Sequence, residues 1–417
     1  MTLNWLRIGF RNLLKNRRRS VFTIMAIAFG FAAITLFGGF THYVYKGLEE
    51  GYVYAHGNGH LTVFRKGFLA EGALDPMSYL LTREESQRIA SLCAADSRIV
   101  MTSPQLNING LVSNGSVSTI MVAEGRVPSD LERMQGIAGG FIRKIKKFDG
   151  QPLGDGPTDG VGMTRTLASR LKLGTGGEAV VVATTVDGFT NALDVRLVQT
   201  ISASVEVLDS MLMTVPLSFA QNLYATTSVD RINVLLADPR TTWRMRAELQ
   251  QRLEAAGLKV EVHTWDELQP SYANIRDMFN VIFFISYLIV MVIVVMSIVN
   301  TVSTAVLERT REIGTLRALG LKRHGVIGMF VIESALLGAA GSLAGTLLTI
   351  VGWLAVRLSD PTWVPPHIPR RVPLEIHLVP EYLAMACLCM ILLAAVAAAI
   401  PARRAAKMAI IDALGHA

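Results

Sequence analysis

A short charged segment lies between two long apolar runs of the sequence, from Glu308 to Gly320, and reads ERTREIGTLRALG. Glu308 and Glu312 are four residues apart, so in a helix they share one face, and Gly320 is placed to end that helix. The apolar residues recur at helical spacing: Ile313, Leu316 and Leu319. A short charged helix that is continuous with two membrane spans is a place where a motor protein would push, so the segment predicts a docking surface for a partner protein. The alternative is a solvated connector that only sets membrane topology.

No group of residues matches a known catalytic or metal-binding pattern. The G-x-S-x-G, H-E-x-x-H and Walker A motifs are all absent from the sequence. The glycine-rich stretch 174–177 precedes no Lys-Ser/Thr pair, so it fits a turn between a helix and a strand. The 3 cysteines offer neither a disulfide framework nor a zinc site. We therefore expect a non-catalytic chain that binds no cofactor or metal, with any ATP and Mg held by a separate ATPase.

The elements that carry the charged segment are membrane spans. The chain has 417 residues, of which 51% are hydrophobic and 18% charged, compared with about 25% charged residues in a typical globular domain. Crossing the hydrocarbon core takes about 20 mostly apolar residues. Four segments meet this requirement: residues 20–45, 277–305, 325–356 and 381–402. The sequence thus predicts an α-helical membrane protein with four transmembrane helices and a large α+β domain, residues 46–276, inserted between helices 1 and 2.

Lysines and arginines beside the spans predict the orientation. Basic residues precede the first span, follow the second and follow the fourth: Arg7, Arg11, Lys15, Arg17, Arg18, Arg19, Arg309, Arg311, Arg317, Lys322, Arg323, Arg403, Arg404 and Lys407. Such residues mark the cytoplasmic side. Both termini, the segment 306–323 and the tail 403–417 are therefore expected in the cytoplasm, and residues 46–276 and 357–380 on the other side. This placement explains the net charge of +7 without nucleic-acid binding.

Residues 1–19 have the pattern of an interfacial amphipathic helix. Apolar residues fall at helical spacing, and basic residues repeat every four positions on another face. The alternative is a basic tail without regular structure. The first span has too long an apolar core for a cleaved signal peptide, so we expect an uncleaved anchor.

The domain between spans one and two has alternating strand and helix patterns. Strands are predicted at residues 60–66, 115–123, 178–185, 194–204, 231–237 and 258–263. Helices are predicted at 82–95, 164–173, 218–225 and 241–256. The Gly-, Pro- and Asp-rich stretch 149–162 predicts a loop that divides the domain into two subdomains.

Two features of the third span concern its packing. Gly341 and Gly345 form a G-x-x-x-G pair, preceded by Gly338, and such small residues let helices approach closely; the competing explanation is the general abundance of glycine in membrane helices. Glu333 is an ionisable group within the span, where it is costly and normally partnered.

The charged segment resembles the coupling segment of the membrane-permease family typified by MacB, LolC, LolE and FtsX. Other stretches resemble the same family: residues 12–16 with 19–20, 330–338, 401–406 with 413–414 and, in the large domain, 59–61 and 213–217. The sequence departs from the family at Ala409-Ile410, where an acid-Pro pair is usual. MacB carries its ATPase on the same chain, whereas the Walker A motif is absent here.

The resemblance implies a permease subunit of an ATP-driven ABC transporter in the bacterial inner membrane. Two copies of a cytoplasmic ABC ATPase would bind a permease dimer, with a homodimer preferred over a heterodimer. ATPase motion would reach the periplasmic domain by mechanotransmission. The implied ATPase-coupling residues are Glu308, Arg309, Arg311, Glu312, Gly314, Leu316, Arg317 and Gly320, and the implied helix-packing residues are Gly338, Gly341 and Gly345.

Three functions remain open under this resemblance. The first is extraction or movement of lipoproteins, lipids or other amphipathic substrates at the outer face of the membrane, with a lipoprotein carrier as a candidate partner. The second is MacB-like efflux of peptides or antibiotics through a periplasmic adaptor. The third is FtsX-like regulation of a cell-wall hydrolase. A stand-alone membrane enzyme finds no catalytic constellation to support it.

Overall fold

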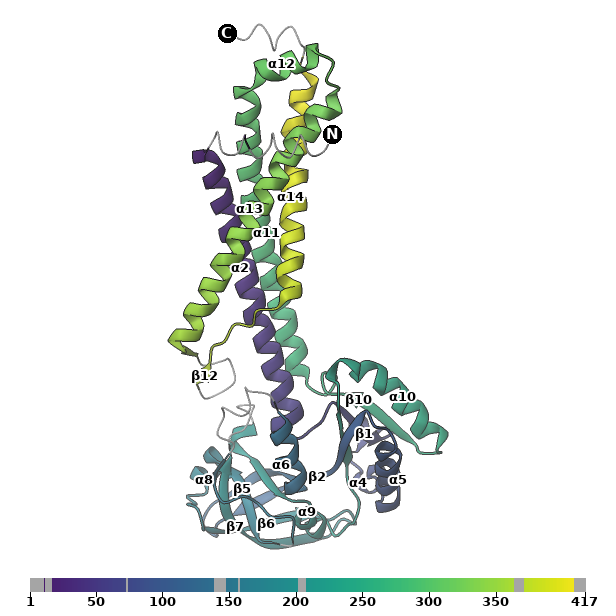
Figure 1. The fold of residues 1–417 in the computed structure, drawn as a ribbon. Coiled ribbons are helices and arrows are strands. Elements are labelled where there is room, and N and C mark those ends of the chain that lie inside the picture. Colours follow the sequence, from purple (N-terminus) through teal and green to yellow (C-terminus); the bar gives the residue numbers. More distant parts are fainter. Residues whose placement is uncertain are drawn as a thin grey trace. The chain divides into compact units, whose positions relative to one another are not determined.

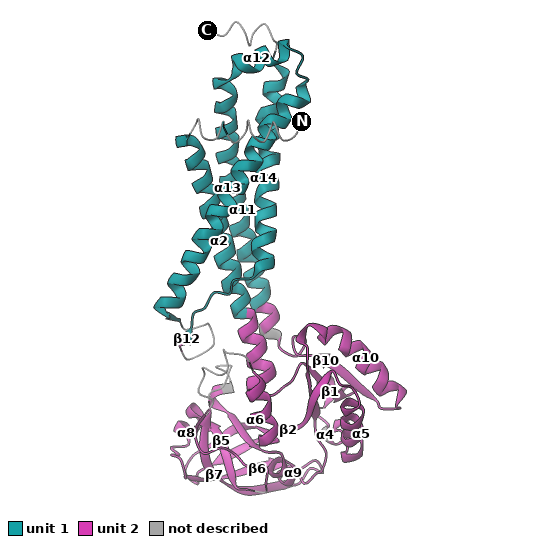
Figure 2. Cartoon of the chain, viewed as in Figure 1, with its two compact units in different colours: residues 1–44, 275–363, 372–417 teal, residues 45–274, 364–371 magenta. Residues whose placement is uncertain are grey.

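The computed structural model describes residues 11, 17–72, 74–138, 148–156, 158–201, 208–363 and 371–408. The chain divides into two compact units (Figure 2). Residues 1–44, 275–363 and 372–417 form the helical unit, and residues 45–274 with 364–371 form the β-rich unit. Most of the predicted interfacial helix at residues 1–19 lies outside the described residues, and Arg17–Arg19 are the first residues of helix α2.

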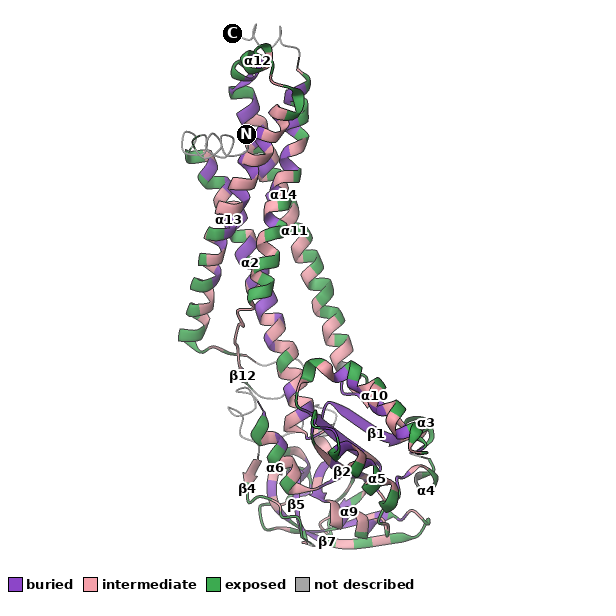
Figure 3. Ribbon diagram, turned by 45° about the vertical axis from the view of Figure 1, so that its right-hand side comes forward, coloured by how far each residue is buried: buried purple, intermediate pink, exposed green. Residues whose placement is uncertain are grey.

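Four helices are long and apolar enough to cross a membrane, as the sequence predicts: α2 (Arg17–Glu50), α11 (Pro270–Glu308), α13 (Arg323–Ser359) and α14 (Pro380–Lys407). The short helix α12 (Thr310–Ala318) joins α11 to α13 at one end of the bundle (Figure 1). Many residues of α11 are exposed (Figure 3), and the large apolar side chains among them include Phe284, Ile289 and Met296. Exposed apolar side chains along so long a helix are typical of contact with lipid.

Two of these helices extend beyond the helical unit. Helix α2 passes residue 44 and continues into a π-helical turn, η1 (Gly51–Ala55), and α11 begins before residue 275. Within the β-rich unit, Trp265 packs on Tyr272 of α11 with ring centroids 4.5 Å apart, and Tyr45 of α2 lies 6.1 Å from Tyr272. Aromatic side chains therefore join the ends of both helices to the same small core.

The predicted packing glycines lie at contacts within the chain. A Cβ added at Gly341 would lie 2.6 Å from Ile27 of α2, and one at Gly345 would lie 2.7 Å from Phe31. Gly338 lies against α14, where an added Cβ would be 3.0 Å from the Cβ of Ala394. The glycines thus allow α13 to approach α2 on one side and α14 on another.

The β-rich unit contains a closed ring of six strands. These are β2 (Ile99–Ser113), β3 (Ser118–Arg126), β5 (Gly160–Thr164), β6 (Glu178–Thr184), β7 (Thr190–Ile201) and β8 (Leu212–Pro216). Each strand pairs with the next around the path β2-β3-β8-β5-β7-β6, and β6 pairs with β2 again. Alternating side chains from all six strands meet inside, including Ile108, Met121 and Met163. The ring is therefore a small barrel filled by its own side chains. Helices α8 (Arg165–Arg170) and α9 (Leu217–Leu223) pack against the same core.

The sheet continues beyond the barrel through β9 (Arg231–Leu236), β1 (Leu61–Arg65) and the edge strand β10 (Val260–Thr264). Helices α5 (Arg83–Ala94) and α10 (Thr242–Ala255) cover this part and share a second core with it. Side chains of α10 also close the outer edge of β10: Gln250 bonds both Val260 O and Val262 N, and Arg246 donates to Val262 O. These contacts occupy groups that an edge strand otherwise leaves free for another chain.

Shorter elements complete the fold. They are α3 (Phe68–Glu71), α4 (Pro76–Tyr79), α6 (Pro128–Ile137), β4 (Phe148–Gly150), η2 (Leu208–Ser210), η3 (Pro239–Thr241), β11 (Thr362–Trp363) and β12 (Val372–Pro373). The prediction of a loop at residues 149–162 is partly wrong. The end of β4 and the start of β5 fall within this range, and both strands pair with β7.

Candidate functional site

The charged segment forms a corner between two long helices. Helix α11 ends at Glu308, the single residue Arg309 leaves helical geometry with φ −112°, and α12 begins at Thr310. After α12 the chain turns at Gly320, whose φ of +99° favours glycine, and α13 begins at Arg323. The expected glycine stop is therefore present, but the helix is shorter than predicted, because the break at Arg309 leaves Glu308 on α11 and Glu312 on α12.

One face of α12 is open to solvent. The exposed residues are Arg311, Glu312, Thr315, Leu316, Ala318 and Leu319. Leu319 is 80% exposed and Leu316 40%, and Leu307 at the end of α11 is 71% exposed. Large apolar side chains beside unpaired charges are typical of a surface that a partner covers.

The opposite face of α12 is buried. Some of the predicted coupling residues therefore face the bundle, and the others face solvent. Ile313 is 4% exposed and Gly314 is buried beside it, so Ile313 packs into the bundle while Leu316 and Leu319 face outward. Arg309 is also buried, and its Nη1 donates to Oε2 of Glu333 at 3.2 Å. Glu333 thus has the partner that its place in a membrane helix requires. Arg309 faces the bundle, and the predicted docking contacts fall to the exposed residues of α12.

Three cationic side chains tie this corner to the other helices. Arg19 at the start of α2 forms an ion pair with Glu308. Arg309 bonds Glu333 of α13, and Arg317 of α12 donates to the backbone carbonyl of Met408 just after α14. Charge-assisted contacts of this kind restrict geometry as well as adding attraction. The corner therefore holds one contact to each of α2, α13 and α14.

A second notable segment lies within the β-rich unit, where the chain passes from η1 to β1, at Gly57-Asn58-Gly59-His60. His60 is fully buried, and its Nδ1 accepts the amide hydrogen of Leu236 at 3.1 Å. The Arg126 guanidinium donates to Asn58 at 2.8 Å. Gly57 and Gly59 both have a φ of +67°. The glycines flanking Asn58 are the signal in the sequence of this special backbone.

Burial lowers the pKa of His60 from 6.5 to about 4, because the charged imidazole loses its water. Because folding lowers the pKa of His60, the folded state favours the neutral imidazole. The stability that this neutral His60 contributes is fully present above pH 6.5 and is lost as the pH falls toward 4. We expect the contribution of His60 to the free energy of unfolding of the β-rich unit to fall by about 3 kcal/mol over that interval. Hydrogen exchange of the β1 and β9 amides in the full chain, corrected for intrinsic rates, measures the change. The variant His60→Gln should lack this component, and an identical pH dependence in the variant would contradict the assignment.

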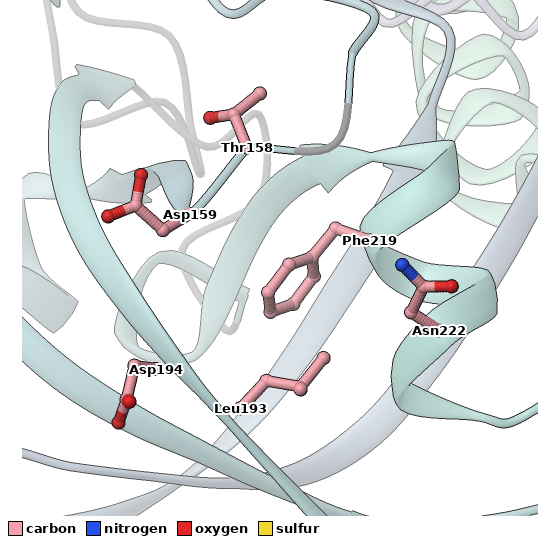
Figure 4. A pocket seen from close by; sticks show the side chains of 6 residues that line it. All are labelled: Thr158, Asp159, Leu193, Asp194, Phe219 and Asn222. Carbon is pink, nitrogen blue, oxygen red and sulfur yellow. The ribbon is translucent and has the colours of Figure 1, made fainter.

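One open hollow lies on the barrel, with a volume of about 200 Å³ (Figure 4). Its lining residues are Thr158, Asp159, Leu193, Asp194, Phe219 and Asn222. The Asp159 carboxylate is already engaged, because Arg196 bonds both of its oxygens at 2.9 Å. Among the described residues there is no group of three or more His, Cys, Asp or Glu side chains placed to hold a metal ion.

Among the described residues, four helices are long and apolar enough to span a membrane, and a β-rich domain is inserted between the first two; this is the architecture of a multi-pass membrane protein. Residues 284–410 match the family described as FtsX, FtsX-like permease C-terminal. This part of the chain, which contains the corner and α12, is similar to the C-terminal part of FtsX-like permeases. The resemblance to the MacB, LolC and FtsX group is thereby confirmed.

Individual relatives match part of the chain. The lipoprotein-releasing system transmembrane protein LolC of Neisseria meningitidis is 27% identical over 53% of this chain and 56% of its own. The macrolide export ATP-binding/permease protein MacB 1 of Yersinia pestis is 27% identical over 48% of this chain and 29% of its own. The chain thus spans about half or less of the length of these relatives.

Two solved structures are similar to this chain. The periplasmic region of MacB from Actinobacillus actinomycetemcomitans shares 15% identity with a TM-score of 0.38, over 53% of this chain and 96% of that one. The extracellular domain of the noncanonic ABC-type transporter YknZ from Gram-positive bacteria shares 10% identity with a TM-score of 0.34, over 49% and 99%.

Proposed function

We propose that this protein is the permease subunit of an ATP-driven transporter and carries motion from a separate ATPase to the β-rich unit. The observation that carries the proposal is the corner at α12, which has an open charged and apolar face and is tied to α2, α13 and α14. Helices α2 and α11 continue into the β-rich unit without a break, so they offer a path for the motion.

The arrangement in the membrane follows from the basic residues beside the spans. We propose that α12 and both termini lie in the cytoplasm of a bacterium, and that the β-rich unit lies in the periplasm. A cytoplasmic ATPase could then reach the exposed residues of α12. We further propose two ATPase copies, which bind ATP and Mg, beneath two permease copies, preferably of this same chain.

For the substrate, we propose a lipoprotein, a lipid or another amphipathic molecule at the outer face of the membrane. An apolar patch on the outside of the barrel supports this proposal. Leu111 of β2 lies opposite Ile120 of β3 and Val182 of β6, and Leu111 and Ile120 are 48% and 63% exposed. Exposed patches of neighbouring apolar residues are typical of binding surfaces. The similarity to LolC is consistent with this choice.

Two other functions rest on the remaining similarities. Efflux of peptides or antibiotics with an adaptor is supported by the similarity to MacB and would make cells sensitive to such compounds after deletion. Regulation of a cell-wall hydrolase is supported by the FtsX-like family match and would be revealed by a hydrolase that binds the β-rich unit.

Purification from native membranes tests the ATPase partner. The charge exchange Arg311→Glu/Glu312→Arg alters two exposed residues of α12 and should reduce ATPase recovery at least tenfold, because opposite charges on the partner become like charges. The control exchange Glu84→Arg/Arg88→Glu reverses one acidic and one basic residue at exposed positions of α5 in the β-rich unit. It should leave ATPase recovery unchanged. Absence of an ATPase from the wild-type preparation would contradict the proposal.

A further inference from the structure

The guanidinium of Arg309 is held inside the helical unit, at the only residue between α11 and α12. Its backbone N–H reaches the carbonyls of Ala305 and Val306 at 3.2 Å, and its own carbonyl accepts from Ile313 N at 2.9 Å. The side chain is 10% exposed, and that of its partner Glu333 is 11% exposed. The main chain of Arg309 therefore forms the corner between α11 and α12, while its side chain contacts Glu333 of α13.

Stability alone does not explain this buried ion pair. Removing two charges from water costs about as much as their attraction returns, so an apolar pair of the same volume is often equally stable. The pair is also incompletely satisfied, because Arg309 Nη2 is buried without a hydrogen-bond partner. The best-supported role of a buried ion pair is to fix one geometry of the groups around it. That role matters most where a partner protein pushes on a short helix.

We propose that Arg309 and Glu333 are a positioning pair that makes α12 and α13 move as one body. The proposal rests on the proposed function of α12 as the ATPase-coupling helix. The exposed residues of α12 bind the partner, and Arg309 transfers the displacement to α13 through Glu333. Breaking the pair leaves the docking face in place and lets α12 move without α13.

Spin-label distances between α12 and α13 test the pair directly. Labels are placed at Ala318→Cys on α12 and Leu347→Cys on α13, both exposed, in a full chain whose native cysteines are replaced by serine. We expect a narrow distance distribution in the wild-type pair, with and without ATP. Glu333→Gln removes the charge at nearly constant volume and should broaden the distribution at least twofold.

Two further variants separate the ion pair from a general packing defect. Arg309→Glu/Glu333→Arg reverses the pair and should restore the narrow distribution. Glu333→Asp keeps the charge on a shorter side chain and should give a distance distribution of intermediate width. This variant tests the ion pair if Glu333→Gln does not fold. An unchanged width in Glu333→Gln, or no recovery in the reversed pair, would overturn the proposal.

The proposed function is tested separately with the same preparations. The ATPase should co-purify equally with wild type and Glu333→Gln, because the docking face is untouched. The distance measurement needs no ATPase. A wild-type preparation without ATPase therefore contradicts the proposed function alone, whereas equal recovery with an unchanged distance contradicts the positioning pair alone.

Discussion

Replacing Gly59 by alanine should destabilise the β-rich unit by at least about 3 kcal/mol. Gly59 has a φ of +67°, which costs other residues about 1–2 kcal/mol. A Cβ there would also lie 2.5 Å from the backbone oxygen of Val234 in β9. Backbone in a central strand cannot move aside without breaking the pairing of β9 with β1 and β2. Urea unfolding of the full chain in detergent, followed by tryptophan fluorescence, measures the loss.

Gly115 provides the matched control for this prediction. It has a φ of +87°, and an added Cβ meets nothing within 4 Å. Gly115→Ala therefore has the backbone strain without the collision, and we expect a loss of about 1 kcal/mol. Equal losses in the two variants would show that the contact with Val234 contributes nothing. The difference between them measures how tightly the loop after η1 is seated on the sheet.

Replacing Gly345 by leucine should separate α13 from α2. An added Cβ lies 2.7 Å from Phe31, which is fully buried, so the larger side chain finds no space. Overpacking of this kind costs about 1–3 kcal/mol and sometimes more. The hydroxyls of Thr35 and Thr349 lie 2.7 Å apart at the same interface. In a chain without other cysteines, Thr35→Cys/Thr349→Cys should form a disulfide, and Gly345→Leu should reduce its yield at least tenfold.

The same helix contains a control for this substitution. A Cβ added at Gly328 of α13 meets nothing within 4 Å, so Gly328→Leu should leave the disulfide yield unchanged. If Gly345→Leu also left the yield unchanged but prevented two copies from associating, the glycine would serve a contact between chains. A G-x-x-x-G pair in a sequence does not by itself reveal which helix faces it.

Several local elements of the β-rich unit were predictable. Thr82 and Glu85 form the reciprocal capping box that begins α5, and the predicted strand 231–237 matches β9 closely. Strand β2 was missed because Pro104, Asn107 and Gly110 are unfavourable in strands. Pairing with β3, β6 and β9 overrides those local preferences.

The candidate site was predicted in outline and corrected in detail. The charged residues and the glycine stop of α12 can be identified from their order along the chain, since helix periodicity is local. Which of them are exposed cannot be identified this way. Arg309 and Arg311 have the same chemistry, yet Arg309 is buried on Glu333 and Arg311 faces solvent.

The four spans and the charged corner follow from the order of residues alone, and so does the expectation for their orientation, because apolar length and charge placement are properties of continuous stretches of chain. The closure of the six-stranded barrel, the packing of Gly341 and Gly345 against α2, and the pairing of Arg309 with Glu333 could be seen only in the folded chain. Each of these depends on contacts between residues far apart in sequence, and their geometry is set by the packing of the whole unit.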